Sequence, residues 1–203
     1  MLMNSKKRYP VFFYQQVFIG FSFVFGMGLS GAFLPLLALE LDPSGTFVGI
    51  VVSAWFLSRI FIEIPSGIIS DRIGRRKPYV IGILLAAIGS LMCATSTSIV
   101  LLILGRTLWG FGAALFFLNN TALLMDQLDP EIRGKAVGIF DGLQFLGSLV
   151  GTSVGAFLSA VIGYKNVFYV AFGLTLLGSF LTFLFRGLRN MGEQPLDTDQ
   201  KII

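Results

Sequence analysis

Six long apolar segments constrain this 203-residue chain more than any other feature of its sequence. Each has at least the roughly 20 residues that an α-helix needs to cross a bilayer. None alternates apolar and polar residues as a membrane β-strand does. We therefore predict an all-α membrane protein with six transmembrane helices, over the segments Val11–Leu39, Thr46–Ile69, Pro78–Thr97, Ile99–Leu124, Lys135–Ile162 and Asn166–Phe185.

The composition argues against a soluble domain. Hydrophobic residues make up 55% of the chain and charged residues only 13%, with a mean hydropathy of +0.81. This leaves too few polar groups to cover a water-soluble protein. There is no histidine, and the single cysteine, Cys93, cannot form a disulfide within the chain. We therefore expect no metal site, no cofactor and no enzymatic activity.

Lysine and arginine gather on one side of the predicted membrane. Most of the 15 fall in the N-terminal segment 1–10, in the connections after the second and fourth spans, and in the polar tail 186–203, whereas Lys165 lies on the opposite side. Because connections rich in Lys and Arg stay in the cytoplasm, we expect a multi-pass protein of the plasma (inner) membrane with both termini cytoplasmic. The basic isoelectric point, about 9.4, then requires no nucleic acid partner.

The connection after the second span, within SGIISDRIGRRKPYV (residues 66–80), packs five charged residues into seven positions. A signal for membrane orientation explains the positive charges. It does not explain Asp71, or Gly67 and Gly74 on either side of it, since glycine permits close backbone approach and unusual dihedral angles. Asp71 precedes Arg75 by four residues, a spacing that predicts an ion pair across one helical turn.

This connection resembles the loop motif that lies between the second and third helices of the major facilitator superfamily. The match holds at every defining position: Gly67, Asp71, Arg72, Gly74, Arg75, Arg76 and Lys77. The fourth span resembles the family's fourth-helix motif, with Trp109 where a glutamine is common, through Leu102, Arg106, Gly110, Gly112 and Ala114. The fifth span resembles the antiporter-type motif in part, because Ser148 replaces a proline and Thr152 a glycine.

The resemblance extends over nearly the whole chain. It implies the N-terminal half of a twelve-helix transporter, built from two inverted repeats of three helices. It also implies alternating access, in which two halves rock around a substrate site. Finally, it implies that Asp71, Arg75 and Asp126 form a charge cluster that locks the cytoplasmic helix ends in one state and releases them in another.

Four ionisable residues inside the predicted spans are candidates for coupling, because a charge at membrane depth is costly and is usually functional. Arg106 either serves proton coupling or an anionic substrate, as the resemblance implies, or bonds backbone carbonyls in a structural role. Arg59 and Glu63 share a helix face and either neutralise each other or exchange partners during transport. Asp141 either binds a cation or proton in a water-filled cavity, which Gln144 would share, or reaches the cytoplasmic interface.

Glycines in the fourth and fifth spans predict close helix packing. Small residues four apart let membrane helices approach closely without a hydrophobic driving force. The same faces would also let one helix slide on another during rocking. The fifth span shows this spacing at Gly138 and Gly142 and again at Gly147, Gly151 and Gly155, and the fourth span contributes Gly110 and Gly112.

These features predict one half of a secondary transporter, such as an efflux protein, that moves a small solute across the lipid bilayer. The sequence has no P-loop, so transport would draw on a gradient, with H+ as a candidate coupling ion, or would be passive. A half alone exposes charged residues to lipid, which predicts a second six-helix half or a homodimer. The alternative is a truncated or non-transporting half with only a structural or assembly role. Sugars, drugs and organic ions fit the sequence alike.

Overall fold

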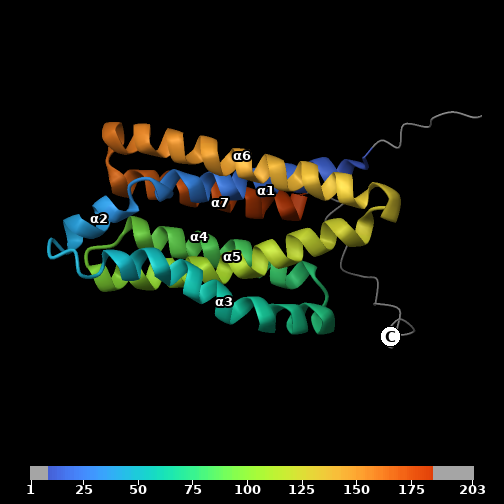
Figure 1. Cartoon of the computed structure of the whole chain (residues 1–203), viewed down its shortest axis with the longest axis horizontal. Coiled ribbons are helices and arrows are strands. Elements are labelled where there is room, and N and C mark those ends of the chain that lie inside the picture. The colour runs from blue at the N-terminus through green and yellow to red at the C-terminus, as the bar shows by residue number, and fades with distance from the viewer. Residues whose placement is uncertain (1–8, 185–203) are drawn as a thin grey trace, which may run out of the picture.

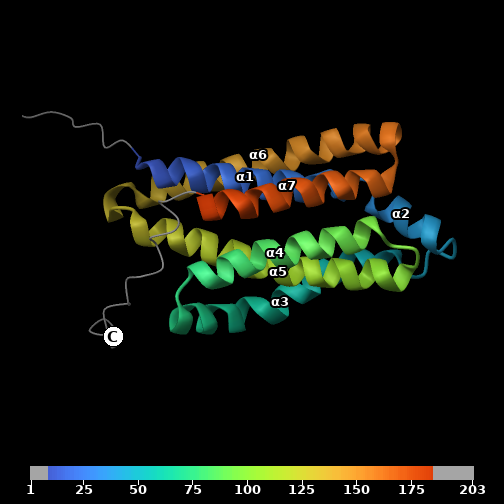
Figure 2. The same cartoon turned by 180° about the vertical axis from the view of Figure 1, so that it is seen from behind.

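The computed structural model describes residues 9–184 as a bundle of long helices (Figures 1 and 2). Six of the helices in this range are long and apolar enough to cross a membrane, which confirms the predicted all-α membrane fold. The predicted terminal segments fall mainly on residues 1–8 and 185–203, outside the described part. The helices are α1 (Val11–Gly31), α2 (Leu34–Leu41), α3 (Val48–Ile73), α4 (Arg76–Ala94), α5 (Ile99–Gln127), α6 (Pro130–Ile162) and α7 (Tyr164–Leu184).

The first predicted span consists of two helices rather than one. α1 ends at Gly31 and the short α2 begins at Leu34. Pro35 lies in the first turn of α2, where a missing N–H leaves no helical bond unmade. The same residue cannot donate to the carbonyl of Gly31, so a continuous helix would lose a bond there. The prediction of one unbroken first helix is therefore wrong at this point.

The charged connection after α3 is shorter than predicted. α3 runs to Ile73 and α4 begins at Arg76, so only Gly74 and Arg75 separate the two helices. Gly74 has a φ of 82°, a conformation that favours glycine. Because the chain leaves the helix here, Asp71 and Arg75 do not share a helical turn. The predicted ion pair between them is wrong for this reason.

The six long helices form two layers, with α1, α6 and α7 in one and α3, α4 and α5 in the other (Figure 1). α3 packs on α5, α6 packs on α1, and α4 packs on α7. The first three spans are α1, α3 and α4, and the last three are α5, α6 and α7. If the two sets are exchanged in order, the α3–α5 pair becomes the α6–α1 pair, and the α4–α7 pair is unchanged. This is the pattern of two three-helix repeats that the sequence resemblance implies.

One end of the bundle carries the start of α1, the α3–α4 junction and the α5–α6 junction (Figures 1 and 2). Most of the described lysines and arginines belong to this end. We call it the basic end, and define it by Arg72, Arg75, Arg76, Lys77, Arg133 and Lys135.

Glycine permits the closest helix contacts of the fold. A Cβ atom at Gly155 would overlap the backbone carbonyl of Leu29 in α1, and one at Gly151 would overlap that of Phe25. Backbones this close are possible only where no side chain intervenes. Five of the predicted glycines lie at such contacts: Gly147, Gly151 and Gly155 against α1, Gly110 against α3, and Gly112 against α4.

Gly138 and Gly142 differ from these five. A Cβ atom at either position would have no neighbour within 4 Å among the described residues. Five positions separate Gly142 from Gly147, which rotates Gly142 by about 140° around the helix axis and away from α1. A packing partner for these two glycines is therefore not among residues 9–184.

Two helices are much less covered than the others. In the most apolar stretches of α3 and α6, 22% and 17% of the residues are buried, against 56% in α4 and 50% in α5. Both helices lie at the front in Figure 1, whereas α4 and α7 lie at the front in Figure 2, which shows the bundle from behind. We call the side that carries Arg59, Phe117 and Asp141 the open face. It is the side on which the candidate site lies.

Candidate functional site

An ion pair joins two helix ends at the basic end. Arg75, between α3 and α4, donates from Nε to a carboxylate oxygen of Asp126 in the last turn of α5, at 2.8 Å. Both side chains are partly exposed, 26% and 43% respectively. Since residues 75 and 126 are remote in the sequence, the pair ties the α3–α4 junction to the end of α5.

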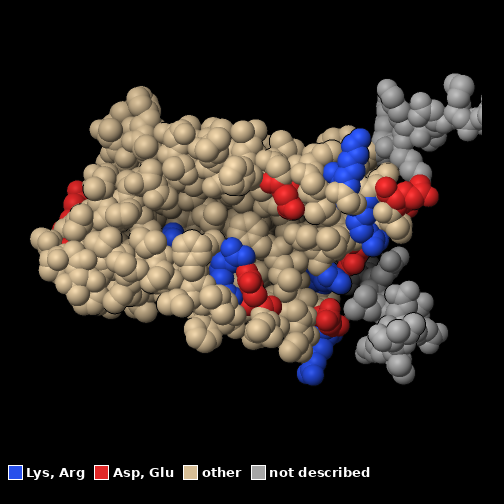
Figure 3. All heavy atoms as spheres, viewed as in Figure 1, with Lys and Arg blue, Asp and Glu red and all other residues tan. Residues whose placement is uncertain are grey.

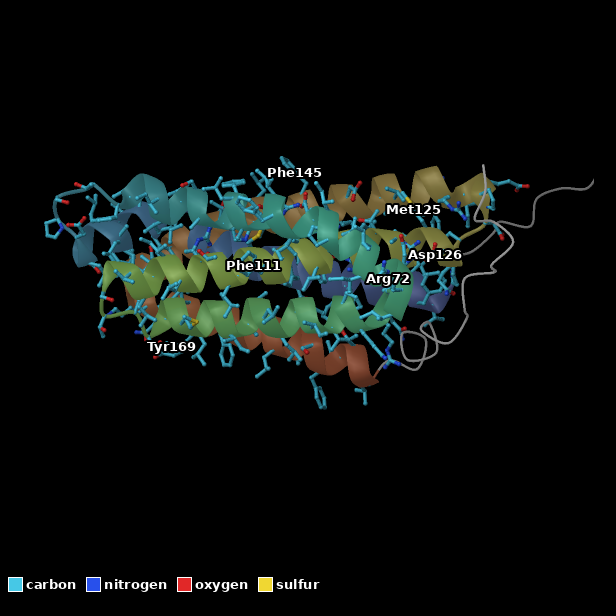
Figure 4. The ribbon with its side chains drawn as sticks, turned by 90° about the horizontal axis from the view of Figure 1, so that it is seen from below. Arg72, Phe111, Met125, Asp126, Phe145 and Tyr169 are labelled. Carbon is cyan, nitrogen blue, oxygen red and sulfur yellow. The ribbon has the colours of Figure 1, made fainter. Side chains whose placement is uncertain are left out.

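Three other charged residues of the loop motif, Asp71, Arg72 and Lys77, form no ion pair with Arg75 or Asp126 in the described structure. Asp71, Arg72 and Lys77 are exposed, and no described residue forms an ion pair with Asp71. Figure 4 shows Arg72 and Asp126 at the same end of the bundle. Gly67 lies on α3, and a Cβ atom added to it would lie 3.9 Å from the side chain of Leu118 in α5. The structure thus brings together two members of the predicted three-residue cluster.

Arg59 and Glu63 form an ion pair on one face of α3. The Arg59 Nε donates to Glu63 Oε1 at 2.9 Å, and a second guanidinium nitrogen contacts the same oxygen. The guanidinium carbon also lies 5.0 Å from the ring centres of Trp55 and Phe117, within range of a cation–π contact. The two charges are therefore compensated where they lie.

Arg106 is buried in α5, with 8% of its surface exposed. Its guanidinium lies 5.4 Å from the ring centre of Trp109, and its Nε has no hydrogen-bond partner. No acidic side chain within residues 9–184 pairs with it. A buried cation held only by an aromatic ring is costly at membrane depth. This arginine therefore differs in kind from Arg59.

Asp141 and Gln144 line a groove between α1, α5 and α6. Asp141 lies 11 residues beyond the start of α6 at Pro130, about 16 Å along the axis, so it is not at the helix end. The groove has a volume of about 280 Å³. Its walls are formed by Val24, Phe117, Thr121, Asp141, Gln144, Phe145 and Ser148.

The distribution of charge separates the basic end from the rest of the open face (Figure 3). Lysine, arginine and acidic side chains crowd the basic end in this view. Away from it, a few charged side chains lie near the middle of the face, beside a hollow between the two front helices. The candidate residues thus form two regions, a charged end and a central hollow.

Comparison with known proteins identifies the family. The model of the Major Facilitator Superfamily matches residues 17–200. The chain belongs to the major facilitator superfamily. Relatives include an uncharacterized transporter of Buchnera aphidicola, 33% identical over 81% of this chain and 44% of the relative. Multidrug resistance protein 1 of Bacillus subtilis is 29% identical, over 78% of this chain and 41% of the relative.

Two further similarities fit this family. Quinolone resistance protein NorA of Staphylococcus aureus is 26% identical over 80% of this chain and 43% of its own length. A crystal structure of the peptide transporter POT in complex with sulfate matches with a TM-score of 0.78, over 93% of this chain and 40% of that one. At 19% identity, that structure supports the fold alone.

Membership in the major facilitator superfamily defines what kind of protein this is. It is an integral, multi-pass membrane protein of a transporter family, embedded in the lipid bilayer. The Buchnera relative is named as a transporter, and the other two relatives are named for drug resistance. The chain spans less than half the length of those relatives, and its six long helices correspond to one transporter half.

Buried amides link the helices, and one of them, Gln16, was not among the residues that the sequence indicated. Gln16 of α1 is fully buried and donates from Nε2 to the backbone carbonyl of Asn120 in α5 at 3.0 Å. Asn119 donates to the carbonyl of Leu115 at 2.7 Å and faces Ser66 of α3 at 3.5 Å. Polar residues within apolar runs are the only sequence signal for such links, and that signal does not name the partner.

The described residues do not include a metal site. No group of three or more cysteine and acidic side chains lies together within residues 9–184. The chemistry available at the open face is therefore that of carboxylates, guanidinium groups, amides and aromatic rings.

Proposed function

We propose that this six-helix unit is one half of a gradient-driven transporter that carries a small solute by alternating access. It requires a second six-helix half, supplied by more of the same chain, by another chain or by a second copy. The observation that carries this proposal is the poor coverage of α3 and α6, which flank the charged hollow of the open face.

The energetics of the bilayer favour a second half. Lipid tails cannot solvate the Arg59–Glu63 pair or the Asp141 carboxylate, and a charge at the bilayer centre costs several kcal/mol. A second half that covers α3 and α6 would replace lipid with protein and water around these groups. The solute path would then lie between the two halves, as in transporters built from repeats.

The basic end is the proposed gate. The Arg75–Asp126 pair fixes the α3–α4 junction to α5, and Asp71 lies beside it on α3 without a described ion-pair partner. We propose that Asp71, with Arg72, Arg76 and Lys77 around it, engages the second half in one state. Release of that contact would let the basic ends of the two halves separate.

The basic end is also proposed to be cytoplasmic. Its arginines and lysines outnumber those at the other end of the described bundle, where Lys165 lies, and the positive-inside rule then sets the orientation. We propose the plasma (inner) membrane as the location and both termini as cytoplasmic. The N-terminal segment 1–10 and the tail 186–203 would flank the transmembrane domain 11–185 on that side.

Export is the proposed direction. Two relatives are named for resistance to multiple drugs and to quinolones, which supports an efflux protein for small organic molecules. We propose H+ as the coupling ion. Arg106, Asp141 and the Arg59–Glu63 pair are the candidate residues, since they are the charged groups at membrane depth.

The mass of the protein in its native membrane tests the need for a second half. We expect the chain, extracted in lipid nanodiscs, to appear at about twice its own 22.1 kDa or with a stoichiometric second chain. A monomer without a partner would contradict the proposal and favour a structural role.

Solute flux into vesicles that contain the assembled protein tests the gate. Asp71→Asn should reduce flux while the assembly stays intact, and Arg106→Ala should do so too if this arginine serves coupling. Glu40→Gln, which removes one negative charge at the opposite end, is the matched control. Flux unchanged by Asp71→Asn would refute the proposed gate.

A further inference from the structure

A second groove, between α4 and α7, lies on the side of the bundle opposite to the open face. Tyr169 of α7 projects away from Phe145 of the open face (Figure 4). Gly173, one helical turn after Tyr169, lines the groove. Figure 2 shows α4 and α7 side by side at the front of the bundle. A second half that covers α3 and α6 therefore leaves this groove exposed to the bilayer.

The groove is apolar and large enough for a ligand. Its volume is about 580 Å³, within the roughly 300–1,000 Å³ typical of small-molecule pockets. No charged residue lines it, and Ser179, the one lining residue with a polar side chain, is buried. The lining consists of Leu84 of α4 and of Gly173, Leu176, Leu177, Ser179 and Phe180 of α7.

Gly173 leaves room in the wall of this groove. A Cβ atom at this position would have no neighbour within 4 Å among the described residues. Leu177 and Phe180, one and two turns further along the same face of α7, are large and exposed. Lipid tails are as apolar as leucine, so an acyl chain is chemically matched to a gap between such side chains.

A lysine lies on the same face of α4 as the groove. Lys77 precedes Leu84 by seven residues, or two helical turns, which places it about 10 Å closer to the basic end. Lys77, Leu84 and the intervening Ile81 are all exposed. Within residues 9–184, Lys77 forms no ion pair. It therefore offers a positive charge above an apolar groove.

This arrangement has the layout of one phospholipid molecule. α4 has 19 residues, about 28 Å, which is close to the roughly 30 Å of the hydrocarbon core. Lys77, the second residue of α4, thus lies near the membrane surface, where lipid phosphates lie, and the groove begins deeper, where the tails lie. Basic sites between transmembrane helices bind anionic lipid head groups.

We infer that this groove binds one tail of an anionic phospholipid whose phosphate is held by Lys77. Ile81 and Leu84 contact the tail from α4, and Phe180 contacts it from α7, so the lipid bridges the two three-helix repeats. The same lysine stands among the charges around Asp71 at the proposed gate, and a bound lipid would neutralise it. The inference goes beyond the proposed function and requires neither a second half nor a particular solute.

Charge argues against a second copy of the chain as the occupant. Two copies in one membrane that met through this groove would form a two-fold interface. That symmetry would place Lys77 of both copies at the same depth along the contact, where like charges repel. A phosphate at the same place is attracted instead.

Native mass spectrometry of the full chain with matched lipids tests the site. Dioleoyl phosphatidylglycerol is anionic, and dioleoyl phosphatidylcholine has the same tails without a net charge. The chain should bind one molecule of the anionic lipid about fivefold more tightly, and Lys77→Gln should remove this preference. Dihexanoyl phosphatidylglycerol has the same head group on short tails. It should bind at least about tenfold more weakly than the dioleoyl form, because each buried methylene adds to the affinity.

Gly173→Leu tests the groove itself. Leucine would occupy the open space and favours a helix over glycine, so the fold should be kept while binding of dioleoyl phosphatidylglycerol falls by about tenfold. Gly49→Leu, the same change on α3 at another position where an added Cβ meets no described atom, should leave binding unchanged. Lys135→Gln, which removes an equal charge from the basic end, should keep the preference for the anionic lipid.

Three outcomes would overturn the site. They are equal binding of the two dioleoyl lipids, an anionic preference that survives in Lys77→Gln, and undiminished binding by Gly173→Leu. A dimer of the chain that Gly173→Leu dissociates would show a second copy in the groove and would overturn it as well. A monomer that binds the lipid through Lys77 would instead refute the proposed second half and leave this site standing.

Discussion

The two halves of α6 are both rich in glycine, but only one half packs through its glycines. Towards the end opposite to the basic end, which we call the outer end of the bundle, Gly147, Gly151 and Gly155 lie against Phe21, Phe25 and Leu29 of α1. Towards the basic end, Gly138 and Gly142 meet no described atom within 4 Å of an added Cβ. Glycine content alone therefore does not define a contact.

The contrast has a geometric cause. In the outer half, both helices advance by four residues from one contact to the next, so a parallel neighbour can follow the seam in register. Gly142 lies five residues before Gly147 and leaves that face. It shares the exposed face of α6 with Asp141 and Phe145 instead. One half of the helix thus packs on α1 through its glycines. The other half packs inward through Ala136 and Phe140, which are fully buried, and its glycines lie on the open face.

The largest predicted effect comes from breaking the α1–α6 seam. Gly155→Val would force a branched side chain into the space of the Leu29 carbonyl, a backbone atom that cannot move alone. We expect destabilisation of about 3 kcal/mol or more, at the upper end of overpacking costs. The measurement is thermal unfolding of the purified protein in lipid nanodiscs. A midpoint equal to that of the parent would show that the helices are not in this contact.

A second variant extends the comparison to the other repeat. Gly110 of α5 packs on α3 as the α6 glycines pack on α1, and its added Cβ would overlap the Ser58 hydroxyl and lie 2.6 Å from the Trp55 carbonyl. Gly110→Ala should cost about 1–3 kcal/mol in the same unfolding assay.

The Ser58→Ala background tests the source of that cost. It removes the overlapping hydroxyl but keeps the Trp55 carbonyl, so Gly110→Ala should become less harmful without becoming neutral. Equal costs in both backgrounds would mean that Ser58 does not face this glycine.

The basic end, where the glycines are unpacked, is linked by charge instead. Arg75→Gln removes the ion pair with Asp126, whose members are 26% and 43% exposed. Exposed ion pairs contribute about 0.2–1 kcal/mol, so the unfolding midpoint should fall only slightly and the difference should shrink in high salt. Asp126→Asn should match it, and the double variant should be no worse than either. Additive losses would show that the two residues act independently.

Sequence reasoning predicted the spans better than the helices. Hydropathy marks where the chain meets lipid, whereas a helix continues wherever its backbone bonds are satisfied. α5 therefore runs past the apolar limit at Leu124 to Gln127, and α6 begins at Pro130, before the predicted start at Lys135. The break before α2 was signalled by Pro35, but an apolar run on both sides concealed it.

Contacts within one helix were predictable, and contacts between helices were not. Arg59 and Glu63 are four residues apart, and that spacing alone placed them on one face. The partner of Arg75 proved to be Asp126, supplied by another helix, whereas spacing within the sequence had favoured Asp71. For Asp126 only the family resemblance gave a signal. The Gln16–Asn120 link had none beyond its polarity, because tertiary packing chose the partner.

The smallest predicted effect separates the two halves of α6 most sharply. Gly138→Ala and Gly142→Ala add a methyl group where space is open, and alanine favours a helix over glycine by up to about 1 kcal/mol. Each variant of the isolated chain should therefore unfold at an equal or slightly higher temperature than the parent. A clear loss of stability in the chain alone would mean that these two glycines face a packed neighbour after all. In an assembly with a second six-helix half, the same methyl groups gain a possible neighbour. Loss of that assembly, with the isolated chain unharmed, would show that these two glycines serve the contact between halves, as the other three serve the contact within one.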